Sequence, residues 1–442
     1  MNTNTREFGT RMLRIPSEVN ALLSAFQLSN PDTGFLEKLK DEEWARLLAF
    51  CDLAQLTLPL AQLRINGMPK WAREWLRAGV ADNALRFERV KATYREMADA
   101  LETAGVEHVV IKGFTQSPDY VADPRFRPQS DIDIFCPPDR VDAAYSACEA
   151  IGYKPSEVKI SYAHADHREP LVRHGDWKWR GKLYDPEMPL SLEVHNCLWN
   201  ERISRIAVPD AESFWERRTT REVEGLSFSC LSPVDHLAYF ALHILRNVLL
   251  RDWVIHHVRE LAVFLHNRAD DDTFWETWKE THSPWLRSLA AVAFHYARAW
   301  FGCRLHPVAV QDIDSLPAAS KSWLKYFSGS ALELMFHPNK DSVWLHLSLL
   351  STRSEKWKLF KRVFIPTRIG PVGYVPIQVH NRKLVQLRGR SPWQQYVAYM
   401  FTRSIAYGRM NFATLGRGLY WRLSEDSLTS KFVPAESYRS HV

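Results

Sequence analysis

Residues 125–136 read Arg-Phe-Arg-Pro-Gln-Ser-Asp-Ile-Asp-Ile-Phe-Cys. From Ser130 onward polar and apolar side chains alternate, which predicts a β-strand with one buried face over residues 131–136. Side chains two apart on a strand project from the same face, so Asp131 and Asp133 point the same way and the isoleucines between and after them face the core. The alternative is a loop Asp followed by an exposed strand Asp, so the interpretation depends on the flanking sequence.

Upstream, residues 106–111 form a short β-branched run that predicts another strand, closed by Lys112-Gly113. A glycine at a strand end lets backbone N–H groups approach a phosphate, and the lysine adds positive charge. Arg125 and Arg127 lie just ahead of the Asp pair, where either could hold a triphosphate. The alternative for both is a proline-rich loop that exposes arginines to solvent.

Downstream, residues 190–198 predict a strand on which Glu193 and His195 share one face. Clustered carboxylates repel each other unless a cation lies between them, and hard oxygen ligands suit Mg²⁺ completed by substrate phosphates. His195 is a candidate to orient Glu193 or to contact a nucleotide, and the alternative is a structural hydrogen bond. Ser130 is a further nucleotide-binding candidate, with local capping as its alternative.

The order Val-Val-Ile-Lys-Gly, then Arg-x-Arg-Pro-x-Ser-Asp-Ile-Asp-Ile, then a helix, then a strand with an acid-x-His pair resembles the uncharacterised bacterial nucleotidyltransferase family. That family is a distant branch of the DNA polymerase β-type superfamily, which includes the aminoglycoside nucleotidyltransferases. The resemblance is tight over about residues 107–136, looser over 190–198, and faint over 232–266. Gly113-Phe114 replaces the usual Gly-Ser, and the spacing from Gly113 to Asp131 is longer than in common members.

The resemblance implies a two-metal mechanism in which Asp131 and Asp133 ligate ions that bridge the nucleotide phosphates, while Glu193 helps to hold the ion nearer the attacking hydroxyl. Two Mg²⁺ ions are expected, with Mn²⁺ as a substitute. The implied reaction transfers a nucleoside monophosphate from an NTP, ATP among them, to a hydroxyl of a small molecule, sugar or peptide and releases pyrophosphate. The rival hypothesis is a degenerate nucleotide- or partner-binding protein, such as an antitoxin or scaffold.

The predicted fold class is α+β, a small mixed-sheet core of polymerase β-like type flanked by helical regions. Helical spacing covers residues 17–104 and 140–151, and Ser232 followed by Pro233 predicts a helix start. We divide the chain into a helical N-terminal region, a nucleotidyltransferase core, a helical domain and a basic, aromatic-rich C-terminal extension, at residues 1–104, 105–230, 231–350 and 351–442.

Composition favours a folded protein, because 46% of the 442 residues are hydrophobic and 24% are charged. The six cysteines include no Cys-x-x-Cys pair, which argues against a thiolate zinc site or a disulfide framework. No apolar run follows the first positive charges, so we expect a cytoplasmic protein without a secretory signal.

Residues 351–442 hold sixteen Lys or Arg and four Asp or Glu, and no acidic residue lies between Lys356 and Ser424. For the segment 356–423 we favour a cationic wall beside the active site, with contact to nucleic acid or to an anionic membrane as alternatives. Arg251 and His256 match the Arg-x4-His pattern of HEPN-type ribonucleases, although such a short pattern often occurs by chance.

Overall fold

The computed structural model describes residues 14–156, 166–173, 175–365 and 392–429, and the backbone of 7–8 and 11–12; in the last helix it describes the side chains of 404–423. The chain forms two compact units. The sheet unit comprises Pro16–Val248 and Asp252–Leu316, and the terminal unit comprises Met1–Ile15, Leu249–Arg251 and Pro317–Val442. The four-region division made from the sequence stays a prediction.

A seven-stranded mixed sheet with the order β5-β6-β7-β4-β3-β9-β8 lies in the sheet unit. The pairs β4–β7 and β3–β9 are parallel and the other neighbours are antiparallel. This mixed sheet among many helices confirms the predicted α+β class. The strands are β3 (Val109–Val110), β4 (Asp131–Phe135), β5 (Lys154–Pro155), β6 (Leu171–Val172), β7 (Ser191–His195), β8 (Thr219–Val223) and β9 (Leu226–Cys230).

The strands predicted from the sequence are present, and most are shorter than expected. The run 106–111 pairs only at Val109 and Val110, and the run 190–198 forms a strand only over Ser191–His195. The β8–β9 hairpin was not predicted. Its two-residue turn, Glu224-Gly225, has φ of 49° and 75°, the left-handed geometry that matches the twist of paired strands.

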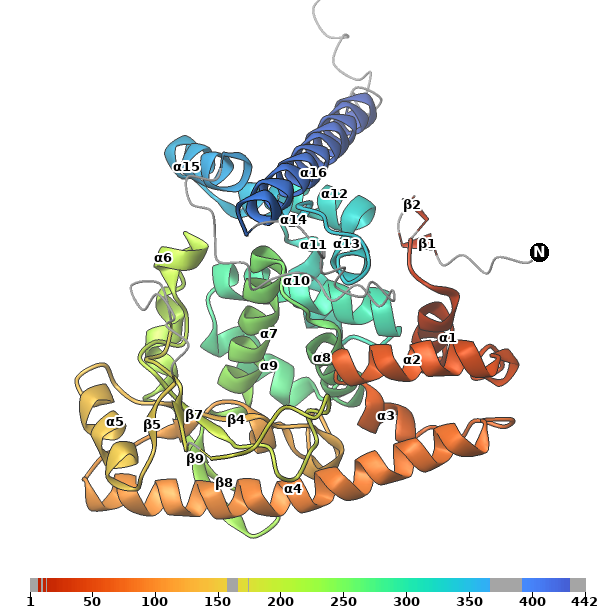
Figure 1. Ribbon diagram of the computed structural model, residues 1–442. Helices are drawn as coiled ribbons and strands as arrows, with labels where there is room; N and C mark the ends of the chain where they lie inside the picture. Colours follow the sequence, from red (N-terminus) through yellow and green to blue (C-terminus); the bar gives the residue numbers. More distant parts are fainter. Residues whose placement is uncertain are drawn as a thin grey trace, which may run out of the picture. The chain divides into compact units, whose positions relative to one another are not determined.

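Helix α4 (Lys70–Thr103) packs its apolar stripe on one face of the sheet. Its buried side chains at Phe87, Val90, Tyr94, Met97 and Leu101 recur every three or four residues, the spacing of one helical face. They share a core with the buried isoleucines of β4 and with α5 (Val141–Ala150), and Figure 1 shows α4 lying against the sheet. This burial fixes which face of β4 is left for polar groups.

Helices build the rest of the sheet unit. Helix α7 begins where the sequence predicted, after Ser232, whose hydroxyl accepts a long hydrogen bond of 3.4 Å from the Asp235 N–H. No described helix is long and apolar enough to cross a membrane. The remaining helices are α1 (Ser17–Ala25), η1 (Leu36–Lys38), α2 (Asp41–Leu53), α3 (Thr57–Ala61), η2 (Gly113–Gln116), η3 (Pro124–Phe126), α6 (Glu201–Ser204), η5 (Pro209–Phe214), α7 (Pro233–Leu250), α8 (Ile255–Asn267), α9 (Asp272–Thr281), α10 (Pro284–Phe301) and α11 (Pro307–Asp314).

The terminal unit is held together by the last helix. The guanidinium of Arg417 lies 2.8 Å from buried Asp341, and Trp421 donates to the Ser322 hydroxyl at 2.9 Å. Of the predicted basic segment 356–423, residues 366–391 and the side chains of 392–403 lie outside the described residues. The elements are β1 (Glu7–Phe8), β2 (Arg11–Met12), α12 (Ala318–Phe327), α13 (Ser330–Glu333), α14 (Ser342–Leu349), α15 (Arg353–Phe364) and α16 (Pro392–Thr429).

Candidate active site

The parallel pairing of β4 and β7 brings the predicted carboxylates together. Asp133 pairs with Glu193 across the two strands, and Asp131 lies opposite Ser191. Because side chains alternate along each strand, the two aspartates and Glu193 share the face opposite the isoleucine core. The sequence therefore placed three acids correctly on one face of two strands, without showing that those strands are neighbours.

Asp133 is the centre of the cluster and is 2% exposed. Lys112 Nζ donates to its Oδ1 at 2.6 Å, and His195 Nε2 lies 2.8 Å from the same oxygen. An ionised carboxylate only accepts hydrogen bonds, so the imidazole places its proton on Nε2. The backbone N–H of Ile111 donates to the Asp133 carbonyl at 3.1 Å, which fixes the strand end that carries Lys112.

Asp133, Glu193 and His195 can each offer a ligand atom, and these atoms lie within 4.8 Å of one another. Among the residues that the structure describes, this is the one group of three or more such side chains that could hold a metal ion. His167 adds a second imidazole, with Nε2 3.7 Å from Glu193 Oε2 and its backbone bridged to His195. Sequence reasoning missed His167, because it lies outside any strand pattern.

The pKa values of the three acids are pushed apart. Burial disfavours ionisation of Asp133, but Lys112 and His195 outweigh burial and hold its pKa well below the usual range. Burial together with the charge on Asp133 raises the pKa of Asp131 to about 6. Burial and the two aspartates raise the pKa of Glu193 well above its usual range. The cluster therefore has more negative charge than its own cation neutralises.

The two basic members respond in opposite directions. Burial opposes the charge of Lys112, but the attraction of Asp133 and its neighbours outweighs this and raises the Lys112 pKa. Burial lowers the pKa of His195 to about 4, although its hydrogen bond to Asp133 acts the other way. At neutral pH the site thus contains one ammonium group and a neutral imidazole.

Gly113 is required by the backbone and by its neighbour. Its φ is +74°, and a Cβ there would lie 2.3 Å from Gln129 Nε2. Gln129 Nε2 in turn donates to the Asp131 carbonyl at 2.7 Å, and buried Arg86 donates to the Gln129 carbonyl at 2.7 Å. Gln129 and Arg86 therefore position the strand that carries the aspartates. Neither was found from the sequence.

The predicted phosphate-binding arginines are paired within the chain. Arg125 lies at the surface, 2.8 Å from Asp123, whereas Arg127 Nε donates to buried Glu260 of α8 at 2.9 Å. The charge on Arg127 still lowers the pKa of Asp131, and a hydrogen bond from Ser130 acts in the same direction. Phosphate binding by these residues stays a prediction.

Histidines gather on α7 and α8, where the rings of His243 and His257 are 5.0 Å apart and those of His256 and His257 are 3.8 Å apart. Burial lowers the pKa of all three, which keeps them neutral. The ribonuclease-like Arg251-x4-His256 pattern stays a prediction.

A mixed sheet that presents three acids and a lysine at adjoining strands is the framework of an enzyme that handles nucleotide phosphates. The chain belongs to the uncharacterised nucleotidyltransferase family, whose family model matches residues 40–302. The match includes every predicted site residue and confirms the resemblance seen in the sequence, over a much longer stretch. No curated protein matches the chain, and no solved structure does.

Proposed function

We propose that this nucleotidyltransferase transfers a nucleoside monophosphate from an NTP to a hydroxyl group and releases pyrophosphate. The observation that carries the proposal is the in-register pairing of Asp133 with Glu193, with Asp131 on the same face. Three acids crowded around one lysine form a site that gains stability from added positive charge. We propose that the reaction takes place in the cytoplasm, where NTPs are available.

The donor set fits divalent cations. Carboxylate oxygens are the preferred ligands of Mg²⁺ and Mn²⁺, and an imidazole nitrogen within the same 4.8 Å group is compatible with Mn²⁺. Asp131, Asp133 and Glu193 would hold two such ions. When bound, they supply positive charge at the attacking and leaving oxygens of an in-line displacement.

The chain's own residues contribute position and proton transfer. His195 and Lys112 hold Asp133 ionised and fixed in direction. Lys112, which directly precedes η2, would turn its ammonium group from Asp133 to a phosphate oxygen. The raised pKa of Glu193 makes its ionised form a stronger base, and this carboxylate would accept the proton of the attacking hydroxyl as the oxygen bonds to the α-phosphorus. The bond to pyrophosphate then breaks.

The acceptor is a small molecule, sugar or peptide hydroxyl, with a protein side chain as the second candidate. The rival proposal is a degenerate protein that binds a nucleotide or a partner without transfer. We favour the enzyme, because a scaffold gains nothing from buried acids that raise each other's pKa.

The test is pyrophosphate release by the full chain with each NTP and Mg²⁺ or Mn²⁺, across a panel of hydroxyl acceptors. Asp133→Asn is expected to lower the rate by more than about 100-fold, since it removes charge worth several kcal/mol at the transition state. Asp139→Asn is the matched control, because Asp139 follows the same strand but is 75% exposed and lies outside the cluster.

Pyrophosphate release, compared with nucleotide binding, separates the two proposals. The enzyme and the scaffold both predict metal-dependent binding of a non-hydrolysable NTP that Asp133→Asn weakens. Binding without pyrophosphate release for any NTP and acceptor would favour the scaffold, and a fully active Asp133→Asn variant would refute the assigned site.

A further inference from the structure

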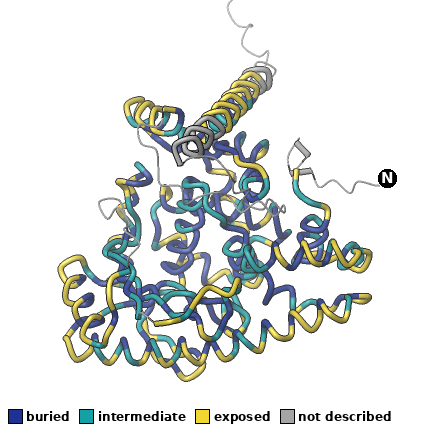
Figure 2. Tube along the Cα trace, in the orientation of Figure 1, coloured by how far each residue is buried: buried dark blue, intermediate teal, exposed yellow. Residues whose placement is uncertain are grey.

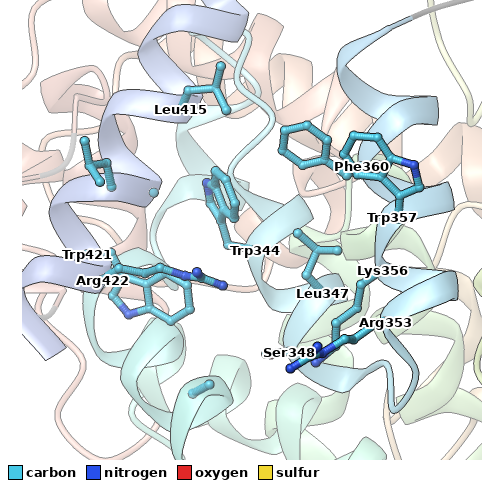
Figure 3. A pocket seen from close by; sticks show the side chains of 13 residues that line it. Trp344, Leu347, Ser348, Arg353, Lys356, Trp357, Phe360, Leu415, Trp421 and Arg422 are labelled. Atoms are coloured by element: carbon cyan, nitrogen blue, oxygen red, sulfur yellow. The ribbon is translucent and has the colours of Figure 1, made fainter. Parts of the chain in front are cut away.

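A hollow of about 930 Å³ lies in the terminal unit between α15 and α16, with α14 behind it. Figure 3 shows Trp344 of α14 at its centre, Trp357 and Phe360 on the α15 side and Trp421 on the α16 side. Its volume lies in the range of small-molecule sites. The hollow lies outside the residues that match the nucleotidyltransferase family, so that family gives it no role.

Cations line this pocket. Arg353 and Lys356 lie together on α15, and Arg422 extends from α16 (Figure 3). None of the described residues that line the pocket is acidic. An apolar hollow bordered by three positive charges fits a ligand that has a hydrophobic body and an anionic head.

The outer surface of α16 continues the apolar lining away from the pocket. Its exposed side chains are spaced by three, four or seven residues and so share one stripe of the helix, and Figure 2 shows this surface as exposed. The opposite side of α16 is hydrogen-bonded to the rest of the terminal unit: the Thr414 carbonyl accepts from Trp344, and Trp421 donates to Ser322. The stripe consists of Ile405, Phe412, Leu415, Leu419 and Leu423.

The positive charge of the pocket argues against two possible occupants that this protein itself could supply. Residues 366–391, which follow α15, contain five basic and no acidic residues, so they would bring more positive charge to a cationic pocket. A second copy would present the same cationic surface. The complementary occupant is therefore an anion with a long apolar part.

We propose that the pocket and the α16 stripe bind the surface of an anionic lipid bilayer, with one lipid chain between Trp344 and Leu419 and its headgroup at Arg353 and Lys356. A bilayer satisfies both parts of this surface, since a basic helix face attracts acidic headgroups and an exposed apolar stripe enters the acyl region. The α16 stripe favours lipid over nucleic acid. Four of its five side chains are aliphatic, and these provide no stacking surface for bases but bury well against acyl chains.

The charge test measures binding of the full chain to vesicles of phosphatidylcholine with and without phosphatidylglycerol, by flotation. Binding is expected only with phosphatidylglycerol. Arg353→Gln with Lys356→Gln is expected to weaken it about 30-fold, from about 1 kcal/mol per basic residue. The matched control, Lys358→Gln with Lys361→Gln, removes two charges from α15 outside the pocket and is expected to lose less. Equal losses would overturn the pocket assignment.

The apolar test uses two leucines of equal exposure. Leu419 is 62% exposed in the stripe and Leu85 is 61% exposed on α4 of the sheet unit. Leu419→Asp is expected to weaken vesicle binding about 10- to 100-fold, which corresponds to the free energy of burying one leucine side chain. Leu85→Asp is expected to leave vesicle binding unchanged. Thermal unfolding of each variant checks that the fold is retained. Unchanged binding by Leu419→Asp would overturn the proposal.

Two further arms identify the source of the ligand. The first arm uses a fluorescent single-stranded RNA. If the RNA binds, the pocket variants weaken this binding, and vesicles do not bind, the ligand is nucleic acid and the lipid proposal is overturned. Binding of monomeric dodecyl phosphate without binding of vesicles would replace the bilayer with a soluble amphiphile and overturn the proposal as stated.

Discussion

The sheet unit contains two buried groups of charges that behave in opposite ways. In the carboxylate cluster of Asp131, Asp133 and Glu193, burial and the neighbouring carboxylates raise the pKa values of Asp131 and Glu193, and the single lysine does not offset them. In the Arg127–Glu260 pair, one cation faces one acid. Burial opposes the charge of Glu260, but Arg127 and His257 outweigh it and lower the Glu260 pKa to about 2.

The difference separates a site that awaits a ligand from one that is complete. A buried acid with a matched partner is stable by itself, and breaking the pair leaves an uncompensated charge. A cluster with excess negative charge gains stability when a cation binds. Buried charge alone therefore does not identify a binding site. An excess of buried acids over buried cations does.

Removal of one acid from each group should give the largest contrast. Glu260→Gln is expected to lower the free energy of unfolding by about 3–5 kcal/mol, because Arg127 loses its buried partner. Glu193→Gln is expected to keep or raise it, because burial and the two aspartates raise the Glu193 pKa and the fold therefore favours the uncharged form of this side chain. Urea denaturation measures both. The exposed Glu88→Gln, which removes the ion pair with Lys91, is the control and should cost less than about 1 kcal/mol. Equal losses for the first two variants would contradict the distinction.

Acid should weaken the Arg127–Glu260 pair. The Glu260 pKa is about 2 in the fold and about 4.3 in an unfolded chain. A lowered acid pKa contributes stability above the unfolded value, here roughly 3 kcal/mol, and loses it as pH falls from about 5 to 2. Urea denaturation from pH 6 to pH 3 should show a smaller decline for Glu260→Gln than for the native chain. Parallel curves would show that the pair does not titrate in this window.

The support beneath the cluster can be tested with two glycines. Gly105 and Gly113 both have positive φ, but a Cβ meets nothing within 4 Å at Gly105 and meets Gln129 at Gly113. Gly105→Ala is expected to cost about 1 kcal/mol from the backbone. Gly113→Ala should cost about 1–3 kcal/mol more, because Gln129 must move. Thermal or urea unfolding gives the difference, and equal costs would mean that Gln129 yields freely.

Cation binding is the smallest expected effect. Mg²⁺ at ten times its dissociation constant should raise the free energy of unfolding by about 1.4 kcal/mol relative to a chelator. The shift should vanish in Asp133→Asn and persist in Glu260→Gln, with thermal unfolding as the measurement. A shift retained by Asp133→Asn would place the cation elsewhere.

Local patterns predicted the elements that hold the acids. The alternation around Asp131 and the helical spacing after residue 140 were sufficient, because each depends on near neighbours in the chain. The β8–β9 hairpin carried a signal that was missed, two alternating runs around Glu224-Gly225. The two-residue pairing of β3 could not be foreseen, since it depends on which strands lie beside it.

Long-range partners could not be predicted from one sequence. Arg127 was expected at a phosphate, but Glu260, its partner in the structure, lies 133 positions away with no pattern connecting the two. Lys112 was expected to bind phosphate, and its contact with Asp133 depends on the register of β3 against β4. His195 was expected to orient Glu193 or touch a nucleotide, with a structural hydrogen bond as the alternative, and its nearer carboxylate in the structure is Asp133.

The parallel pairing of β4 with β7 also determines when the site can form. Asp133 pairs with Glu193, which lies 60 positions further along the chain, and Val110 of β3 pairs with Cys230 of β9, which lies 120 positions further. Distant pairings close late in folding, because the chain loses loop entropy before the contacts form. During synthesis, a chain that has emerged only to residue 190 has two aspartates and no third ligand. Tight cation binding should therefore appear at the end of folding, which makes a bound ion a reporter of a finished sheet.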